Sequence, residues 1–361
     1  MNIRKAIRVN FFLSELYYRM HMDDIAIMLG SKTFERKIDK AIKKFLPEYA
    51  DMSGEEIRNL RDDIKQSYYV CKANPEEYFL LGLKDCDNEQ KRQFVTDKFL
   101  YRTMGKYASR KKHDEEIEDK YNFYLLAKDF FGRRVIKVSA DSDYQSFEDM
   151  AIQLRHLILK PLDSSMGKGI KAISIDTKEQ AREEFDKLLN EGEAWIVEER
   201  IKQSESMAVW NESSVNTVRV LSFLRNGDFH VLTPFLRTGR KGSIVDNAGS
   251  GGIFANVDAQ IGILSTEGID ECGRRYEKHP DSGLQFIGWQ IPQYEELIAT
   301  VRKMHTTIMP SHPYIGWDMA LTAKEWVVIE SNWGQFVNQY ADHIGLKNKF
   351  LEYVTGKRQK K

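Results

Sequence analysis

The chain has 361 residues, of which 42% are hydrophobic and 30% charged, a balance typical of a globular protein with two or three packed subdomains. Lys plus Arg and Asp plus Glu number 54 each, so the net charge is zero, which argues against a nucleic-acid-binding protein. Three cysteines without metal-ligand spacing favour a reducing cytoplasm over a disulfide framework, and no apolar run approaches the length of a transmembrane helix.

Residues 1–118 are predicted to be mainly helical. A helix near residues 3–16 is amphipathic, and we expect it to pack on its own domain, with peripheral contact with a membrane as the alternative. Ser53 and Glu56 form a capping-box pattern at the start of a later helix. The region has no GxGxxG fingerprint and no βαβ alternation, so it does not predict a dinucleotide-binding domain.

A helix over residues 119–131 is expected to lead through Gly132 into a strand. Residues 156–170, HLILKPLDSSMGKGI, then predict a second strand that ends at Lys160 and runs into a glycine- and serine-rich loop. Lys160 would supply a positive charge at the strand end, and backbone N–H groups of such a loop can bind phosphate oxygens. The Walker A spacing is absent, and a plain surface turn is the alternative.

An amphipathic helix is expected over 177–191, before the apolar strand WIVEERI at 195–201. Residues 214–264 alternate strands with glycine-containing turns and predict a β-meander that carries Arg219 and Arg237. Their guanidinium groups could bind a γ-phosphate or a substrate carboxylate, or form cross-strand salt bridges. Further helices are expected over 292–309 and 335–356.

The stretch 314–334, YIGWDMALTAKEWVVIESNWG, predicts two strands joined by a short polar connection. Glu330 and Asn332 are two residues apart on the second strand, so their side chains share a face. Two carboxylates and an amide oxygen would be ligands that Mg²⁺ prefers. Asp318, Glu330 and Asn332 are therefore the candidate metal ligands, with a solvated acidic edge hairpin as the alternative.

The register of this hairpin decides whether Asp318 joins the other two residues. If Thr322 pairs with Trp326, Asp318 lies directly opposite Glu330. A slip of one residue would move Asp318 to the other face of the sheet. We expect the first of these registers.

These stretches, in this order, resemble the ATP-grasp superfamily, whose pattern is a lysine, a glycine-rich flap, an adenine hinge, an acid and a Glu-x-Asn for magnesium. The segments that carry the resemblance are Lys160, SSMGKG, VEERI, Asp318 and Glu330-Ser331-Asn332. SVNTVRV at 214–220 and DNAGSGGI at 246–253 resemble the sugar-transfer-associated branch found in bacterial polysaccharide loci, and the chain is also similar to teichuronopeptide-biosynthesis-type members. The resemblance covers roughly residues 119–340.

The resemblance implies an α+β fold in which two α+β subdomains clasp ATP, and the sequence pattern places a mainly helical N-terminal region before them. The expected parts are a helical region over 1–118, a small subdomain with the flap and hinge over 119–205, and a large subdomain with the magnesium and substrate site over 206–361. Many relatives have an α/β domain at the N-terminal position, and the helical pattern of residues 1–118 departs from that.

The resemblance also implies the contacts to ATP. Lys120, in an Asp-Lys pair like that of D-alanine–D-alanine ligases, would reach the phosphates, with Lys137 as its rival. Backbone groups of Glu199 and Ile201 would bind the adenine. Glu198 would accept from the exocyclic amine, and Glu205 would hold the ribose. The implied ATP-binding residues are Lys120, Lys160, Ser164, Ser165, Gly167, Lys168, Gly169, Glu198, Glu199, Ile201 and Glu205.

The implied activity is ADP-forming carboxylate–amine ligation through an acyl phosphate, with ATP and Mg²⁺ as cofactors and with Arg219, Arg237 and Lys160 in catalysis. The branch implies that an amino acid or amine is joined to a sugar acid in the assembly of a capsule or O-antigen, in the cytoplasm. A kinase acting on a sugar hydroxyl and a nucleotide-binding regulator are the alternatives. The expected partners are small or sugar-linked substrates and no nucleic acid, and the sequence leaves homodimerisation open.

Overall fold

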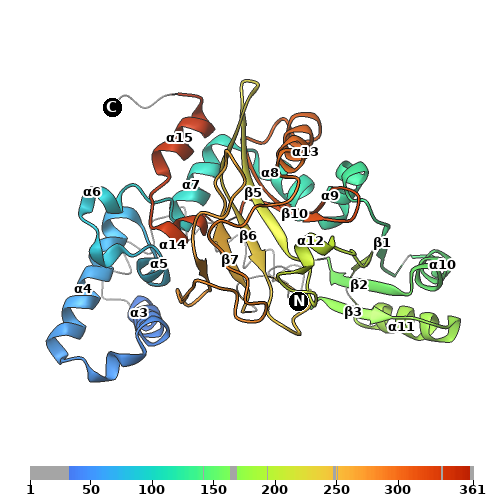
Figure 1. The fold of residues 1–361 in the computed structure, drawn as a ribbon, viewed down its shortest axis with the longest axis horizontal. Helices are drawn as coiled ribbons and strands as arrows, with labels where there is room; N and C mark the ends of the chain where they lie inside the picture. The colour runs from blue at the N-terminus through green and yellow to red at the C-terminus, as the bar shows by residue number, and fades with distance from the viewer. Residues whose placement is uncertain are drawn as a thin grey trace. The chain divides into compact units, whose positions relative to one another are not determined.

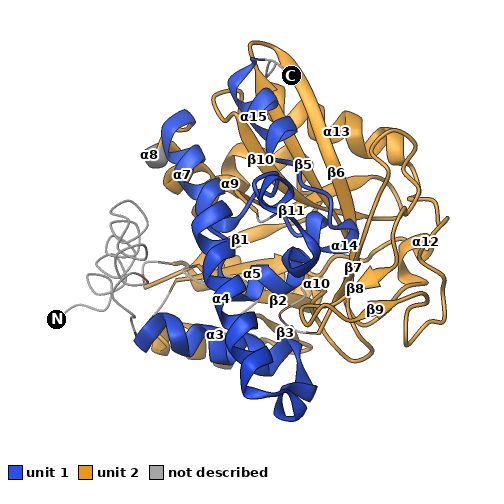
Figure 2. Ribbon diagram, turned by 90° about the vertical axis from the view of Figure 1, so that its left-hand side faces the viewer, with its two compact units in different colours: residues 1–107, 335–361 blue, residues 108–334 orange. Residues whose placement is uncertain are grey.

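The computed structural model describes residues 32–140, 142–162, 169–192, 194–246, 249, 251–334 and 336–357. The chain divides into two compact units, one formed by residues 1–107 with 335–361 and one formed by residues 108–334 (Figure 2). The sequence analysis assigned the end of the chain to its last subdomain, whereas in the structure this end folds with the N-terminal segment. The amphipathic helix expected near residues 3–16 lies outside the described residues. In the described ranges no helix is long and apolar enough to cross a membrane.

The first unit is helical in its described part. Its helices are α3 (Lys32–Phe45), α4 (Gly54–Cys71), α5 (Pro75–Leu80), α6 (Asn88–Lys91), α7 (Asp97–Tyr107), α14 (Asn338–Asp342) and α15 (Lys347–Thr355). The capping box expected at α4 is confirmed, because the Glu56 N–H donates to Ser53 Oγ (3.2 Å) and the Ser53 N–H donates to the Glu56 carboxylate (2.8 Å). Local side-chain chemistry therefore sets where α4 begins.

Two helices, α14 and α15, stand where the sequence predicted one helix over 335–356. His343 ends α14 in the left-handed conformation, at φ 55°. Gly345 follows so close to Gln93 that a Cβ on it would lie 2.6 Å from the Gln93 backbone, and the Lys347 N–H donates to the Gln93 carbonyl (2.8 Å). This contact with a residue far away in sequence interrupts the helix.

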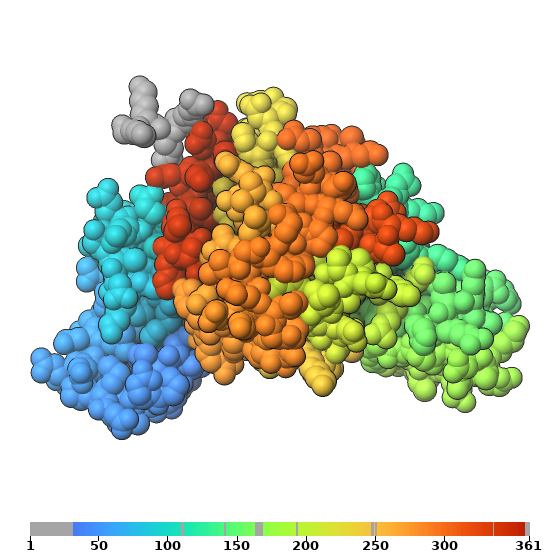
Figure 3. Space-filling view, in the orientation of Figure 1, coloured from blue at the N-terminus to red at the C-terminus, as the bar shows by residue number. Residues whose placement is uncertain are grey.

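The second unit contains two antiparallel sheets. The smaller sheet has the strands β1 (Val135–Val138), β2 (His156–Pro161), β3 (Lys171–Ser174) and β4 (Trp195–Glu199), in the order β1-β4-β2-β3. Figure 1 labels β1, β2 and β3 of this sheet. Helices α10 (Tyr144–Leu154) and α11 (Lys178–Asn190) accompany it, and their outer sides are exposed (Figure 3).

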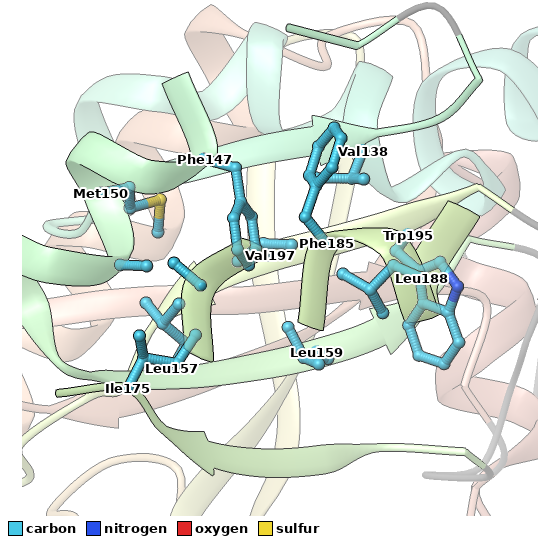
Figure 4. Close-up of a cluster of buried hydrophobic side chains, with 12 residues drawn as sticks. Val138, Phe147, Met150, Leu157, Leu159, Ile175, Phe185, Leu188, Trp195 and Val197 are labelled. Carbon is cyan, nitrogen blue, oxygen red and sulfur yellow. The ribbon is translucent and has the colours of Figure 1, made fainter. Parts of the chain in front are cut away.

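One face of the smaller sheet is apolar and packs against α10 and α11. Val138, Leu159 and Val197 point from the strands toward Phe147 of α10 and Phe185 of α11, and all five side chains are buried (Figure 4). Because side chains alternate along a strand, the neighbouring positions lie on the opposite face of the sheet. Polar side chains of the strands can therefore lie on the face of the smaller sheet opposite this apolar core.

The larger sheet has the strands β5 (Thr217–Arg225), β6 (Asp228–Thr238), β7 (Ile253–Asn256), β8 (Gly268–Ile269), β9 (Arg275–Tyr276), β10 (Tyr314–Leu321) and β11 (Trp326–Asn332). Their order is β11-β10-β5-β6-β7-β8-β9. The turn predicted between β5 and β6 lies at Asn226-Gly227, where both residues have positive φ as a two-residue hairpin requires.

Helix α13 (Tyr294–Thr307) contacts one face of the larger sheet through a buried hydrogen-bond network. Trp317 Nε1 donates to Ser222 Oγ (2.7 Å), and Ser222 Oγ lies 2.7 Å from His305 Nδ1. The other elements of the unit are α8 (Arg110–His113), a π-helix (Asp114–Glu118), α9 (Lys120–Ala127), a 3-10 helix (Lys128–Phe130) and α12 (Glu205–Ala208). With this face filled by Trp317 and its neighbours, the residues at alternate positions, Arg219, Asp318 and Glu330, point to the other face.

Candidate active site

The hairpin of β10 and β11 places Asp318 directly opposite Glu330, as the sequence analysis expected. The turn of the hairpin differs from the expected one, because Leu321, not Thr322, pairs with Trp326. Thr322 instead accepts hydrogen bonds from the N–H groups of Lys324 (3.2 Å) and Glu325 (3.1 Å), which makes the turn one residue longer.

A β-bulge restores the register that the longer turn would have lost. Met319 pairs with Val328 and Asp318 pairs with Glu330, so Ile329 is an extra residue on β11. Without this bulge, Asp318 would pair with Ile329 and would face away from Glu330. The bulge is therefore the backbone feature that brings the two carboxyl groups to one face.

Two arginines from the neighbouring strands hold Asp318. Arg219, its partner on β5, donates from Nε to Asp318 Oδ1 and from Nη2 to Oδ2 (2.8 Å). Arg237, on β6, donates from Nη2 to Asp318 Oδ2 (2.8 Å). The Asp318 side chain is fully buried, and the two guanidinium groups compensate its charge there.

Asn332 joins this cluster at the end of β11. Its Oδ1 accepts from Arg219 Nη1 (3.0 Å) and from the Gly334 N–H (2.6 Å). A Cβ on Gly334 would collide with Arg219 Nη1 and would lie 2.5 Å from Asn332 Oδ1, so a glycine is required at this position. Asp318, Glu330 and Asn332 thus converge as the spacing of two predicted.

The remaining charges of the cluster lie around Arg237. Its Nε donates to Thr217 Oγ1 (3.0 Å) and lies 3.5 Å from Asp246 Oδ2, and Thr217 Oγ1 also donates to Asp246. Burial raises the pKa of Asp246 and outweighs the opposing effect of Arg237. The pKa of Arg237 is raised because the attraction of Asp246 and Asp318 exceeds the effect of burial.

Asp318 and Glu330 have opposite pKa shifts. Burial alone would raise the pKa of Asp318, but Arg219 and Arg237 hold it well below its ordinary range. Burial, and then the charge of Asp318 and a hydrogen bond with it, raise the pKa of Glu330 from 4.5 to about 7. The arginines therefore leave the charge of Glu330 incompletely compensated, which favours its protonated form over that of Asp318.

A divalent cation fits this arrangement. In the ranges that the structure describes, no three or more His, Cys, Asp or Glu residues gather as a metal site, so the candidate set is two carboxylates and one amide oxygen. Hard oxygen ligands of this kind suit Mg²⁺. A cation beside Glu330 would take the place of its proton and relieve the repulsion from Asp318.

The smaller sheet presents two lysines on the face that its apolar core does not use. Lys137 of β1 and Lys160 of β2 both pair with Ile196, so they lie on the same face. Lys160 Nζ binds the Glu198 carboxylate at 2.9 Å and its side chain is 14% exposed. Lys137 is exposed, and its Nζ lies 5.9 Å from the centre of the Tyr121 ring.

The Glu198 side chain is occupied by cations in this structure. Besides Lys160, it accepts from Arg133 Nε (2.9 Å) and lies 2.8 Å from Arg133 Nη2. Burial would raise the pKa of Glu198, but Arg133 and Lys160 lower it to about 2. In this structure the carboxylate holds Lys160 and Arg133, and its predicted role as acceptor for an adenine amine stays a prediction.

Lys120 lies at the base of the glycine-rich segment. Its Nζ donates to the carbonyls of Leu162 (2.9 Å) and Pro161 (3.4 Å), at the end of β2. Ser164, Ser165, Gly167 and Lys168 lie outside the described residues. Gly169 is described, and it needs to be a glycine because its φ is +75° and a Cβ would lie 2.8 Å from Pro161 Cγ. Lys120 therefore contacts the end of β2, and whether Lys120 or its rival Lys137 reaches phosphate stays a prediction.

The expected adenine hinge is only partly available. The Glu199 N–H donates to the Arg134 carbonyl (2.9 Å), so it is already used within the protein. Among the described residues none accepts a hydrogen bond from the Ile201 N–H, which keeps the predicted role open for Ile201. Glu205 is exposed at the start of α12, and its predicted contact with ribose stays a prediction.

Sequence reasoning did not identify Arg133, Thr217 or Gly334 as residues of this site. Arg133 follows Gly132 in a charged stretch, and nothing in the local pattern indicates that its side chain is only 3% exposed. Thr217 could have been found, because it lies two residues before Arg219 on the same strand and so shares its face. Gly334 could have been suspected from its place directly after the Glu-x-Asn stretch.

Comparison with known proteins gives one family and a set of solved structures. A family model described as sugar-transfer associated ATP-grasp matches residues 101–355. The chain is 13% identical to D-alanyl-alanine synthetase A from Vibrio cholerae, with a TM-score of 0.42, and the match covers 67% of this chain and 65% of that one. For the ATP-grasp ligase PsnB complexed with minimal precursor, the identity is 12%, the TM-score 0.42 and the coverage 72% and 67%. For D-alanine–D-alanine ligase from Bacillus anthracis the identity is 13% and the TM-score 0.38, and the match covers 67% of this chain and 67% of that one. No curated protein matches the chain.

Proposed function

Because the chain belongs to the sugar-transfer associated ATP-grasp family and has its fold, we propose that it is an ATP-dependent carboxylate–amine ligase. The observation that carries this proposal is the cluster on one face of the larger sheet, where Glu330 and Asn332 adjoin Asp318, which two arginines hold. Such a cluster offers oxygen ligands for a cation and positive charge for anionic substrates. Lys160, on the smaller sheet, is the candidate phosphate ligand.

The proposed reaction has two steps. A substrate carboxylate oxygen attacks the γ-phosphorus of ATP, the bond from that phosphorus to ADP breaks, and an acyl phosphate forms. The amine nitrogen of the second substrate then attacks the acyl carbon, the carbon–oxygen bond to phosphate breaks, and an amide, phosphate and a proton are released. Catalysis of this kind depends on positioning and on electrostatic stabilisation of the transferred group.

Each part of the described site has a role in this proposal. Bound Mg²⁺ would neutralise charge on the β- and γ-phosphates. Asp318, Glu330 and Asn332 would hold it, and Lys160 and Lys120 would bind phosphate oxygens. Arg219 and Arg237 share the single carboxylate of Asp318, and the positive charge that it leaves uncompensated would attract an anionic acceptor.

The substrate class in this proposal comes from the family description and from the charge of the site. Two arginines suit an acceptor that carries a carboxylate, and the sugar-transfer association suggests that this acceptor is a sugar acid joined to an amino acid or amine in surface-polysaccharide assembly. We propose the cytoplasm as the place of the reaction, because ATP is supplied there.

The experiment that tests the proposal follows three products in parallel. The purified protein is incubated with Mg-ATP and a panel of uronic acids crossed with amino acids, and ADP, free phosphate and amide are measured. Hydroxylamine without the amine should trap the acyl phosphate as a hydroxamate. Phosphate bound stably to a sugar hydroxyl, without hydroxamate, would establish a kinase instead, and AMP with pyrophosphate would refute both reactions.

Arginine variants are poor controls for this experiment. Removing one partner of a buried ion pair costs about 3–5 kcal/mol, so Arg219→Ala would change folding as well as catalysis. Glu330→Gln is the better inactive control, since its carboxyl group has no cation of its own among the described ion pairs.

A further inference from the structure

Arg133 is a buried cation between the two sheets of the second unit. Its side chain is 3% exposed. From Nε it donates to the Glu198 carboxylate on β4 (2.9 Å), and from Nη1 it donates to the carbonyl of Val328 on β11 (2.8 Å) and to that of Phe131 (3.0 Å). The guanidinium also lies 4.5 Å from the centre of the Phe131 ring. One side chain thus connects a strand of each sheet.

The backbone before Arg133 is built for this position. Gly132 has a φ of +57°, and a Cβ on it would lie 2.5 Å from Val327 Cγ1. Only a glycine allows the chain to pass so close to β11 in this conformation. The close approach places the next side chain, that of Arg133, against Val328.

We propose that Arg133 is a positioning residue that sets both halves of the active site, holding the Lys160–Glu198 pair for the nucleotide and the β11 bulge for the metal ligand Glu330. The inference rests on the proposed function, because it takes Lys160 as a phosphate ligand and Glu330 as a metal ligand. Neither role requires Arg133 to touch a substrate.

The first half of the argument is one of charge. Glu198 accepts from two cations, Arg133 and Lys160. With Arg133 present, one carboxylate is shared by two positive charges, so Glu198 compensates the charge of Lys160 only in part and the ammonium group can still attract phosphate. Without Arg133, Lys160 and Glu198 would neutralise each other and the ammonium group would be held by the carboxylate alone.

The second half concerns the bulge. Val328 is the residue before Ile329, the extra residue that turns Glu330 to the face of Asp318. A bulge disrupts the regular ladder of hydrogen bonds. Arg133 Nη1 supplies a hydrogen bond to the Val328 carbonyl at that point, and so stabilises the backbone two residues before Glu330.

The test compares Arg133→Met and Arg133→Lys with the control Arg134→Met. Arg134 is the next residue, it is exposed, and its side chain donates to Gln153 (2.5 Å) rather than to either sheet's polar face. The readouts are ADP affinity by calorimetry without Mg²⁺, the Mg²⁺ midpoint for ADP binding, thermal unfolding, and hydrogen exchange over 326–332.

We expect Arg133→Met to weaken ADP binding at least tenfold, to raise the Mg²⁺ midpoint, and to speed exchange over 326–332. Arg133→Lys restores the charge but lacks the planar fork that reaches two acceptors in different directions. It should therefore recover ADP affinity to within threefold while exchange in β11 stays fast and the Mg²⁺ midpoint stays high. Arg134→Met should behave as the wild type in every measurement.

A double-variant cycle with Glu198→Gln distinguishes positioning from simple stabilisation. If Arg133 acts on the nucleotide through Glu198, Arg133→Met should change ADP affinity less than twofold in the Glu198→Gln background. Equal effects in both backgrounds would overturn that half of the proposal. If Arg133→Met does not fold, Arg133→Lys is the deciding variant. Wild-type hydrogen exchange in β11 together with a wild-type Mg²⁺ midpoint in Arg133→Lys would overturn the claim that Arg133 holds the β11 bulge.

The wild-type protein separates this inference from the proposed function. Failure of the wild type to bind ADP would refute the nucleotide site and the inference with it. Normal binding by the wild type, together with normal binding by the Arg133→Met variant, would refute only the inference.

Discussion

At the scale of single residues, Asp318 and Glu330 differ in how far neighbouring positive charge compensates their carboxyl groups. Asp318 has both oxygens in hydrogen bonds with guanidinium groups, whereas Glu330 has the Asp318 carboxyl group as its neighbour. A buried acid beside another acid is a position where a proton or a cation is favoured. Glu330 is therefore the residue at which loss of charge should have the clearest effect on function.

We predict that Glu330→Gln lowers turnover by roughly a hundredfold or more while the melting temperature stays the same or rises, because the variant removes a metal ligand and a like-charge repulsion together. Turnover and its dependence on Mg²⁺ are the measurements. The matched control is Glu325→Gln in the turn of the same hairpin, where the side chain is exposed. A Glu330→Gln variant with wild-type rate and Mg²⁺ dependence would contradict the assignment.

The raised pKa of Glu330 predicts a pH dependence. Its value in the fold is about 7 against an ordinary 4.5, so without metal the folded protein favours the neutral acid, and ionisation of Glu330 should reduce stability as the pH rises from about 4.5 to 7. Metal binding displaces that proton, so Mg²⁺ affinity should fall about tenfold per pH unit below pH 7. Calorimetric titration with Mg²⁺ between pH 5.5 and 8.5 measures this, and the slope should vanish in Glu330→Gln.

At the scale of elements, the β10–β11 hairpin combines a turn and a bulge that compensate each other. The turn is one residue longer than expected because Thr322 caps it, and Ile329 on β11 adds one residue in return. The end of β11 is equally constrained, since Asn332 Oδ1 accepts from the Gly334 N–H and from Arg219. The metal ligands thus depend on backbone features on both sides of Glu330.

We predict that Gly334→Ala lowers Mg²⁺-dependent turnover at least roughly tenfold and destabilises the protein by about 1–3 kcal/mol, because the added Cβ forces Arg219 and Asn332 apart. Turnover and denaturant unfolding are the measurements. Gly105→Ala is the control, since a Cβ there has open space within helix α7 and should leave turnover unchanged while raising stability by up to about 1 kcal/mol. Wild-type turnover in Gly334→Ala would show that Arg219 and Asn332 can move without consequence.

At the scale of the whole molecule, every described residue of the candidate site lies in the unit of residues 108–334. The family match begins and ends inside the other unit, at residues 101 and 355. The described helices of that unit carry their own buried contacts, such as the hydrogen bonds between Gln339 and the Val95 backbone (both 3.0 Å). The two units can therefore respond differently to a ligand.

We predict that Mg-ADP slows hydrogen exchange in β10, β11 and β4 but leaves α4 of the first unit nearly unchanged. Binding at a hundred times the Kd stabilises the state that binds by about 2.7 kcal/mol, and this stabilisation reaches only amides that open together with the site. Exchange measured by mass spectrometry with and without Mg-ADP tests it. Equal protection of α4 would mean that the two units open as one.

Local chemistry in the sequence was sufficient for several features. The spacing of Glu330 and Asn332 placed both on one face because side chains alternate along a strand. Ser53 with Glu56 located a helix start, and Asn226-Gly227 located a hairpin turn, because each depends only on neighbouring residues. The α+β ATP-grasp fold followed from the order of such segments, and the family match confirms it.

Tertiary structure alone decided the rest, because it depends on residues that are distant in sequence. Arg133 lies 65 residues from Glu198 and 195 from Val328, and no local pattern relates the three. The break between α14 and α15 follows from contact with Gln93, a residue far away in sequence. A sequence pattern reports which face a side chain occupies, whereas packing determines which partner it meets there.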